Sequence, residues 1–128
     1  MYIRFIVRRQ DEDSRSYTGL FTEAYRLRDS EDLESYELTR LENALSWMRA
    51  NLNIPKCLSE QGNERAISWF KPGAKKPLSC AWEIVYLLRE RGVPVEMIKS
   101  SDPGTIIFED GWQVVAKPRR SGRLHVSQ

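Results

Sequence analysis

The chain has 128 residues, enough for one domain with a hydrophobic core and too few for several such domains. Its hydrophobic content of 41% and its net charge of +2 are those of an ordinary globular protein, so composition gives no sign of nucleic-acid binding. No stretch approaches the roughly 20 consecutive apolar residues of a transmembrane helix, and the N-terminal residues are not expected to be a signal peptide. We therefore expect a cytoplasmic protein.

The N-terminal segment, residues 2–8, alternates between apolar and polar positions. Ile3, Phe5 and Val7 share one face, and the other face carries Arg4 and Arg8 together with Tyr2 and Ile6. This period of two predicts a β-strand with one buried face and one half-exposed face. A polar loop over residues 10–16 follows.

Three segments have the 3.6-residue period of an amphipathic helix: 19–28, 36–52 and 77–91. Ser35 is the expected N-cap of the second helix, and Gly92 is the expected stop after the third. The apolar stripes are Leu20, Ala24 and Leu27 in the first helix; Leu38, Leu41, Ala44, Leu45, Trp47, Met48 and Leu52 in the second; and Leu78, Ala81, Trp82, Ile84, Val85 and Leu88 in the third.

Apolar runs at 66–71 and 93–99 predict two further strands, and the first of them is expected to be central. Segments 105–109 and 112–117 flank Asp110-Gly111, a strong hairpin signal. The order β-α-α-β-α-β-β-β predicts a single α+β domain over residues 1–117. We expect a mixed sheet of about five strands, with helices mainly on one face and a right-handed parallel crossover through the third helix. Residues 118–128 are expected to form a flexible basic tail.

Enzymatic chemistry has little support in the sequence. The one histidine, His125, lies in the tail, and Cys57 and Cys80 have no metal-ligand or catalytic spacing, so we expect reduced, inert thiols. Nucleotide-binding glycine motifs and zinc spacings are absent. The acidic residues at 11–13 and 109–110 are better explained as loop and turn residues than as ligands of a hard cation. We expect no enzyme, no cofactor and no metal.

The stretch SWFKPGAKKP, residues 68–77, places three lysines around the start of the third helix, where the helix dipole disfavours cations. A phosphate at this helix start would be bound by free backbone N–H groups and by the lysines. An aromatic side chain could stack on a base there, and the arginines of strand one and its following loop could complete the site. The predicted ligand-binding residues are Lys71, Lys75, Lys76, Trp69, Arg4, Arg8, Arg9 and Arg15. The open alternative is that Trp69 is core and that the cations are solvated or pair with the acidic segment 29–37.

Several segments carry a resemblance in the same order along the chain: IRFIV, DEDS, GLF, AISWFK, GVPV, PGTIIFED and QVVA. Together they make residues 1–117 similar to a family of small uncharacterised bacterial and phage-encoded proteins. The resemblance implies one small domain in a bacterial cell or a phage-infected host, and it implies no catalytic residues. After WFK, that family is usually polar and often acidic, so Lys75 and Lys76 would be particular to this chain.

Three functional readings follow. The first is a non-enzymatic binding protein for a phosphorylated, nucleotide-like small molecule, such as a phage protein that sequesters a host nucleotide signal. The second is a protein-interaction module, either a homo-oligomer or a partner inhibitor with a Trp-containing surface. The third is a nucleic-acid-binding accessory protein, which the basic tail would favour.

Overall fold

A computed structural model describes residues 1–8 and 17–119 of the chain. Its contacts divide the chain into two compact units, each assembled from separate stretches of sequence. The helical unit consists of residues 5–52 and 75–98, and the sheet unit consists of residues 1–4, 53–74 and 99–128. The chain therefore passes from one unit to the other at four points.

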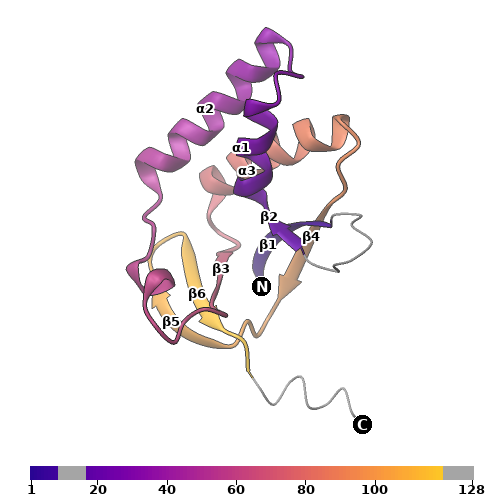
Figure 1. Cartoon of the computed structure of the whole chain (residues 1–128). Coiled ribbons are helices and arrows are strands. Elements are labelled where there is room, and N and C mark those ends of the chain that lie inside the picture. The colour runs from indigo at the N-terminus through magenta and orange to yellow at the C-terminus, as the bar shows by residue number, and fades with distance from the viewer. Residues whose placement is uncertain (9–16, 120–128) are drawn as a thin grey trace. The chain divides into compact units, whose positions relative to one another are not determined.

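Three helices form most of the helical unit: α1 (Leu20–Asp29), α2 (Ser35–Asn51) and α3 (Lys75–Glu90). They lie against one another, with α3 in contact with both α1 and α2 (Figure 1). The predicted helices are confirmed, because every boundary falls within two residues of the periodic segment. Their buried apolar side chains are Leu20, Ala24 and Leu27 of α1, Leu41, Ala44, Leu45 and Met48 of α2, and Pro77, Cys80, Ala81, Ile84, Val85, Leu87 and Leu88 of α3.

Helices α2 and α3 are antiparallel, and a buried carboxylate fixes their shared end. Glu37, in the first turn of α2, accepts a hydrogen bond of 2.9 Å from the backbone N–H of Glu34. The same carboxylate pairs with Arg91, which follows the last residue of α3. Glu34, and not the predicted Ser35, is thus the N-cap residue. Ser35 instead begins the helix.

Strand β1 (Tyr2–Arg8) takes part in both units. In the helical unit, its last three residues pair antiparallel with β2 (Tyr17–Gly19), and β4 (Val95–Ser100) also pairs with β1. The sequence did not predict β2, because three residues are too short to show a period of two. Phe5, Ile6 and Val7 are all buried, so the half-exposed face predicted for β1 does not extend to Ile6.

The strands of the sheet unit pair antiparallel in the order β1, β3 (Ile67–Phe70), β6 (Gln113–Lys117) and β5 (Thr105–Glu109). Ile3 of β1 pairs with Phe70 of β3, β3 pairs with β6, and β6 pairs with β5. Strands β3, β6 and β5 follow one another side by side in Figure 1. This confirms the central position predicted for β3 and the predicted hairpin. A short 3-10 helix, η1 (Lys56–Ser59), precedes β3.

These elements confirm the predicted α+β class and, once β2 and η1 are added, the predicted order. Every strand pair whose register is defined is antiparallel. The β1–β4 pair runs antiparallel as well, because the N–H of Arg8, at the end of β1, donates a hydrogen bond to the carbonyl oxygen of Pro94, just before β4 begins. The sheet is thus antiparallel rather than mixed as predicted. The two neighbours of β3 are β1 and β6, so β4 is not the direct neighbour of β3. Within the described residues, no helix has the length and apolarity needed to cross a membrane.

Candidate functional site

The three lysines of the predicted anion site have different surroundings. Lys71 directly follows β3 in the sheet unit, and its Nζ is 2.6 Å from Oε2 of Glu109. Lys75 and Lys76 begin α3 in the helical unit. Because an ion pair with Glu109 already occupies Lys71, only Lys75 and Lys76 remain together as neighbours at a helix start.

Lys75 and Lys76 are both exposed in the first turn of α3, and that turn contains no acidic residue. Nζ of Lys76 lies 5.6 Å from the ring centroid of Trp47 on α2, a cation–π contact within the helical unit. The side chain of Lys76 therefore has a partner inside the protein, whereas Lys75 extends from the helix start into solvent.

Trp69 is unsuited to stacking on a ligand, because its side chain is only 7% exposed. The guanidinium of Arg4 lies 5.3 Å from its ring centroid, within the sheet unit. Arg8, in the helical unit, pairs with Glu96 at 2.7 Å. Arg9 and Arg15 lie outside the described residues. For Trp69, the alternative reading of a core side chain agrees with the structure.

The acidic residues of the β5–β6 turn are engaged in an ion pair and in turn hydrogen bonds, and the Cys80 thiol is buried. No group of three His, Cys, Asp or Glu side chains gathers there to hold a metal ion. Glu109 is paired with Lys71, and Asp110 accepts hydrogen bonds inside its own turn. Burial raises the pKa of the Cys80 thiol, which disfavours the reactive thiolate. Residues 11–13 lie outside the described residues.

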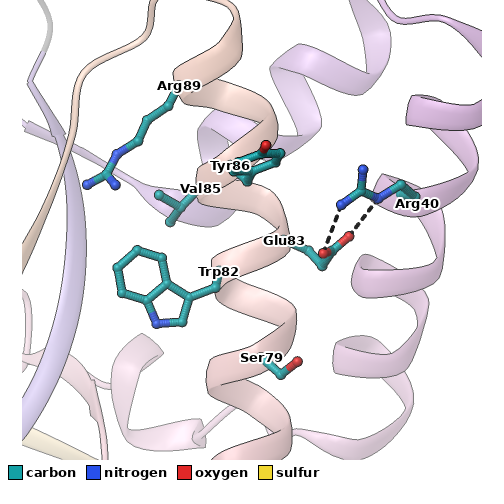
Figure 2. Close-up of a pocket in the computed structure, with 7 residues that line it drawn as sticks. All are labelled: Arg40, Ser79, Trp82, Glu83, Val85, Tyr86 and Arg89. Atoms are coloured by element: carbon teal, nitrogen blue, oxygen red, sulfur yellow. Dashed lines mark hydrogen bonds and ion pairs between the residues drawn. The ribbon is translucent and has the colours of Figure 1, made fainter.

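An open hollow of about 650 Å³ lies along α3 in the helical unit. We call the part of this hollow that carries aromatic rings and charged groups the aromatic–arginine face. Figure 2 shows its side chains projecting from α3 and, on the facing helix, Arg40 of α2. The face consists of Arg40, Trp82, Glu83, Tyr86 and Arg89, and the hollow also reaches Ser79 and Val85.

Trp82 is exposed but held in place. Its side chain is 41% exposed, although Phe5 packs against it edge to face with ring centroids 5.1 Å apart. The guanidinium of Arg89 lies 5.7 Å from the Trp82 ring centroid. Arg89 is itself anchored, because its Nη2 donates a hydrogen bond of 2.8 Å to the carbonyl oxygen of Val95. Contacts within the protein therefore restrict both the ring and the cation.

On the other side of α3, Arg40 reaches Glu83 through two parallel hydrogen bonds of 2.9 and 3.0 Å. These bonds and the nearby charge of Glu83 raise the pKa of Arg40. The Arg40 guanidinium also lies 6.0 Å from the Tyr86 ring centroid, and Tyr86 is 55% exposed. Figure 2 shows Arg40 and Glu83 pointing toward each other between the two helices.

The charges of this face do not cancel. Arg40 and Glu83 neutralise each other, while Arg89 has no carboxylate partner among residues 1–8 and 17–119. The face therefore presents one uncompensated positive charge beside two exposed aromatic rings. Such a surface favours an anionic group next to an apolar or aromatic one.

Sequence reasoning assigned Trp82 to the side of the core stripe and named none of the other members of the face as site residues. A signal was present, because Trp82, Tyr86 and Arg89 occur at positions i, i+4 and i+7 of a helix and so share one face. Arg40 was not predictable in this way, because its pairing with Glu83 joins residues that are 43 positions apart.

Comparison with known proteins gives no family or template, since no family model, no curated protein and no solved structure matches the chain. The resemblance to small bacterial and phage-encoded proteins stays a prediction.

Proposed function

We propose that this chain is a non-enzymatic protein-interaction module that docks its partner on the aromatic–arginine face. The observation that carries the proposal is the pair of exposed aromatic rings, Trp82 and Tyr86, beside the uncompensated guanidinium of Arg89. Trp, Tyr and Arg are the side chains most enriched among the residues that dominate binding energy at protein interfaces.

Preorganisation supports the same function. Association costs side-chain entropy for every flexible group that must be ordered. Contacts with Phe5 and Arg89 already restrict Trp82, and the bidentate pair with Glu83 already restricts Arg40. Few side chains of this face then have to be ordered when a partner binds.

The shape of the hollow favours a macromolecule over an enclosed small ligand. Small-molecule sites bury most of the surface of their ligand inside a concave pocket. Here the hollow is open, and Tyr86 is 55% exposed on the outer side of a helix. A flat or convex partner surface can cover such a helix face and its two rings.

Site-specific photo-crosslinking tests this function. A photoreactive phenylalanine analogue replaces Tyr86 in the full chain, produced in the cells that naturally carry it. We expect irradiation to give a covalent adduct with a protein, and we expect Trp82→Ala on the same chain to reduce the adduct severalfold because an interface anchor is lost. Mass spectrometry of the adduct identifies the attached protein.

The matched control carries the same analogue in place of Ile54, which is 87% exposed in the sheet unit. An adduct at position 86 and none at position 54 supports the proposal. No protein adduct at position 86, or the same adduct at both positions, contradicts it. A second copy of the chain and an unrelated protein both count as partners in this test.

A phosphorylated, nucleotide-like ligand is the second candidate function, and we propose it for the start of α3. Lys75 and Lys76 are exposed in a first turn that has no acidic residue, and free backbone N–H groups at a helix start favour an anion. Calorimetry with mono- and cyclic nucleotides tests it. We expect Lys75→Ala/Lys76→Ala to weaken binding at least about tenfold, since each charge-assisted bond contributes about 1.5–3 kcal/mol.

Lys56→Ala is the control for this titration, because Lys56 is an exposed lysine of the sheet unit. If the double variant and the wild type bind nucleotide equally well, the two lysines do not contribute to the site. Binding that weakens steeply with salt and extends to single-stranded oligonucleotides would instead support the nucleic-acid reading.

A further inference from the structure

We infer that the partner of the aromatic–arginine face is a second copy of this chain. The acidic loop, residues 29–34, would dock in each copy on Arg89 of the other, giving a two-fold symmetric dimer. This inference rests on the proposed function, because it names the occupant of the same face. It is carried by charge complementarity between two surfaces of the helical unit.

The acidic loop holds two carboxylates that the rest of the described chain leaves uncompensated. Glu31 and Asp32 are exposed, and neither forms an ion pair with a residue among 1–8 and 17–119. Asp29, at the start of the loop, pairs with its neighbour Arg28 at 3.1 Å. The loop therefore offers carboxylates to Arg89 of another copy, and Arg89 has no carboxylate partner among the described residues of its own molecule.

Hydrogen bonds hold the loop in one conformation. Oγ of Ser30 donates to the carbonyl oxygen of Leu27 at 2.7 Å and accepts from the N–H of Asp32 at 3.2 Å. Glu31 has a φ of 64° in the left-handed region. The two carboxylates are thus presented from an ordered turn, which lowers the entropy lost on docking.

An aromatic side chain accompanies the acidic loop, as the face requires. Tyr36 follows the loop in the first turn of α2 and is 65% exposed. Its ring would pack against Trp82 or Tyr86 of the other copy while Glu31 and Asp32 approach Arg89. Aromatic pairs of this kind add binding energy beyond the apolar area that they bury.

The positions of the two surfaces suit a symmetric pairing. The ion pair of Glu37 with Arg91 places the start of α2, and hence the loop before it, beside the end of α3 that carries Arg89. Loop and face thus belong to one compact unit and to the same end of it. In an isologous dimer each contact occurs twice, so a modest pairwise attraction is doubled.

Charge reversal tests the dimer with the full-length chain. The readout is the dissociation constant from sedimentation equilibrium over a wide range of protein concentration. We expect the wild type to dimerise, and we expect Arg89→Glu and Glu31→Lys/Asp32→Lys each to weaken dimerisation at least about tenfold, because each creates like-charge contacts twice.

Mixing the two variants distinguishes a specific contact from general damage. In a mixed dimer, one loop meets its native Arg89, and the other contact has both charges reversed, so every contact is attractive. We expect the mixture to form heterodimers with nearly wild-type affinity although each variant alone dimerises at least about tenfold more weakly. Arg65→Glu, an exposed arginine of the sheet unit, is the charge-matched control and should dimerise like the wild type.

Each result of these experiments either supports or contradicts the proposed dimer. A wild type that stays monomeric at all concentrations, or variants that dimerise normally, overturns the second copy as the partner. A mixture that does not recover overturns the pairing of the loop with Arg89. Should Arg89→Glu fail to fold because its bond to Val95 is lost, the loop variant alone still tests the pairing. A heterologous adduct at position 86 with a monomeric wild type would keep the proposed function and remove only this inference.

Discussion

Asp110 organises the hairpin turn between β5 and β6 through a single carboxylate. Its Oδ1 accepts hydrogen bonds from the backbone N–H groups of Trp112 at 2.8 Å and Gln113 at 2.9 Å. Burial alone would raise the pKa of Asp110, but these bonds and those of the Gln113 and Asn53 side chains lower it overall. The ionised carboxylate is therefore part of the folded turn.

A lowered pKa makes this contribution depend on pH. The folded state binds the Asp110 proton more weakly than the unfolded state, so the contribution is complete above the ordinary aspartate pKa of about 4 and is lost as pH falls through the folded value. We expect Asp110→Asn to lower the melting temperature at pH 7, and we expect the difference from wild type to shrink at acidic pH.

Thermal unfolding between neutral and acidic pH measures this difference. Glu60→Gln, at an exposed position in the sheet unit, serves as the control and should change little at any pH. A difference between wild type and Asp110→Asn that stays constant down to acidic pH would show that the carboxylate charge does not stabilise the turn.

At the scale of elements, Gly104 controls the connection between β4 and β5. Its φ is 120°, a conformation that L-residues with a side chain rarely adopt. A Cβ at this position would lie 2.1 Å from the carbonyl oxygen of Lys117, the last residue of β6. The strand end thus approaches so closely that only glycine fits the turn.

We expect Gly104→Ala to destabilise the protein by at least about 2 kcal/mol, since backbone strain of this kind costs about 1–3 kcal/mol before the steric clash is counted. Denaturant-induced unfolding measures the change. Gly73→Ala is the control, because a Cβ there has no atom within 4 Å and should have a small effect. Equal stability of the two variants would mean that the turn can relax away from Lys117.

Local patterns predicted most elements because hydrophobic periodicity records which side of an element is buried. The stripes of α2 and α3 continue over several turns, so their boundaries were predicted to within two residues. β2 has three residues and no period, and its pairing with β1 is a tertiary contact. The N-cap of α2 was misplaced by one residue, because Glu34 is selected by its bond with Glu37 rather than by intrinsic capping preference.

At the scale of the whole molecule, the site was harder to predict than the fold. Lys71, Lys75 and Lys76 are close in sequence, yet the chain crosses from the sheet unit to the helical unit between residues 74 and 75. Lys71 instead forms an ion pair with Glu109, and Arg40 forms one with Glu83. Such pairs are set by topology, and no spacing in a single sequence records them.

The repeated passage of the chain between its units has a consequence for biosynthesis. A ribosome releases β3 long before β6, whose register with β3 runs from residue 113 to residue 116. The helical unit likewise waits for residues 75–98, which are made after both η1 and β3. All residues of the helical unit are present once residue 98 has been made, whereas the sheet unit still lacks β5 and β6 at that point. The nascent chain must therefore keep apolar strand edges exposed until nearly all 128 residues have been synthesised, and this interval is when a chaperone would matter most.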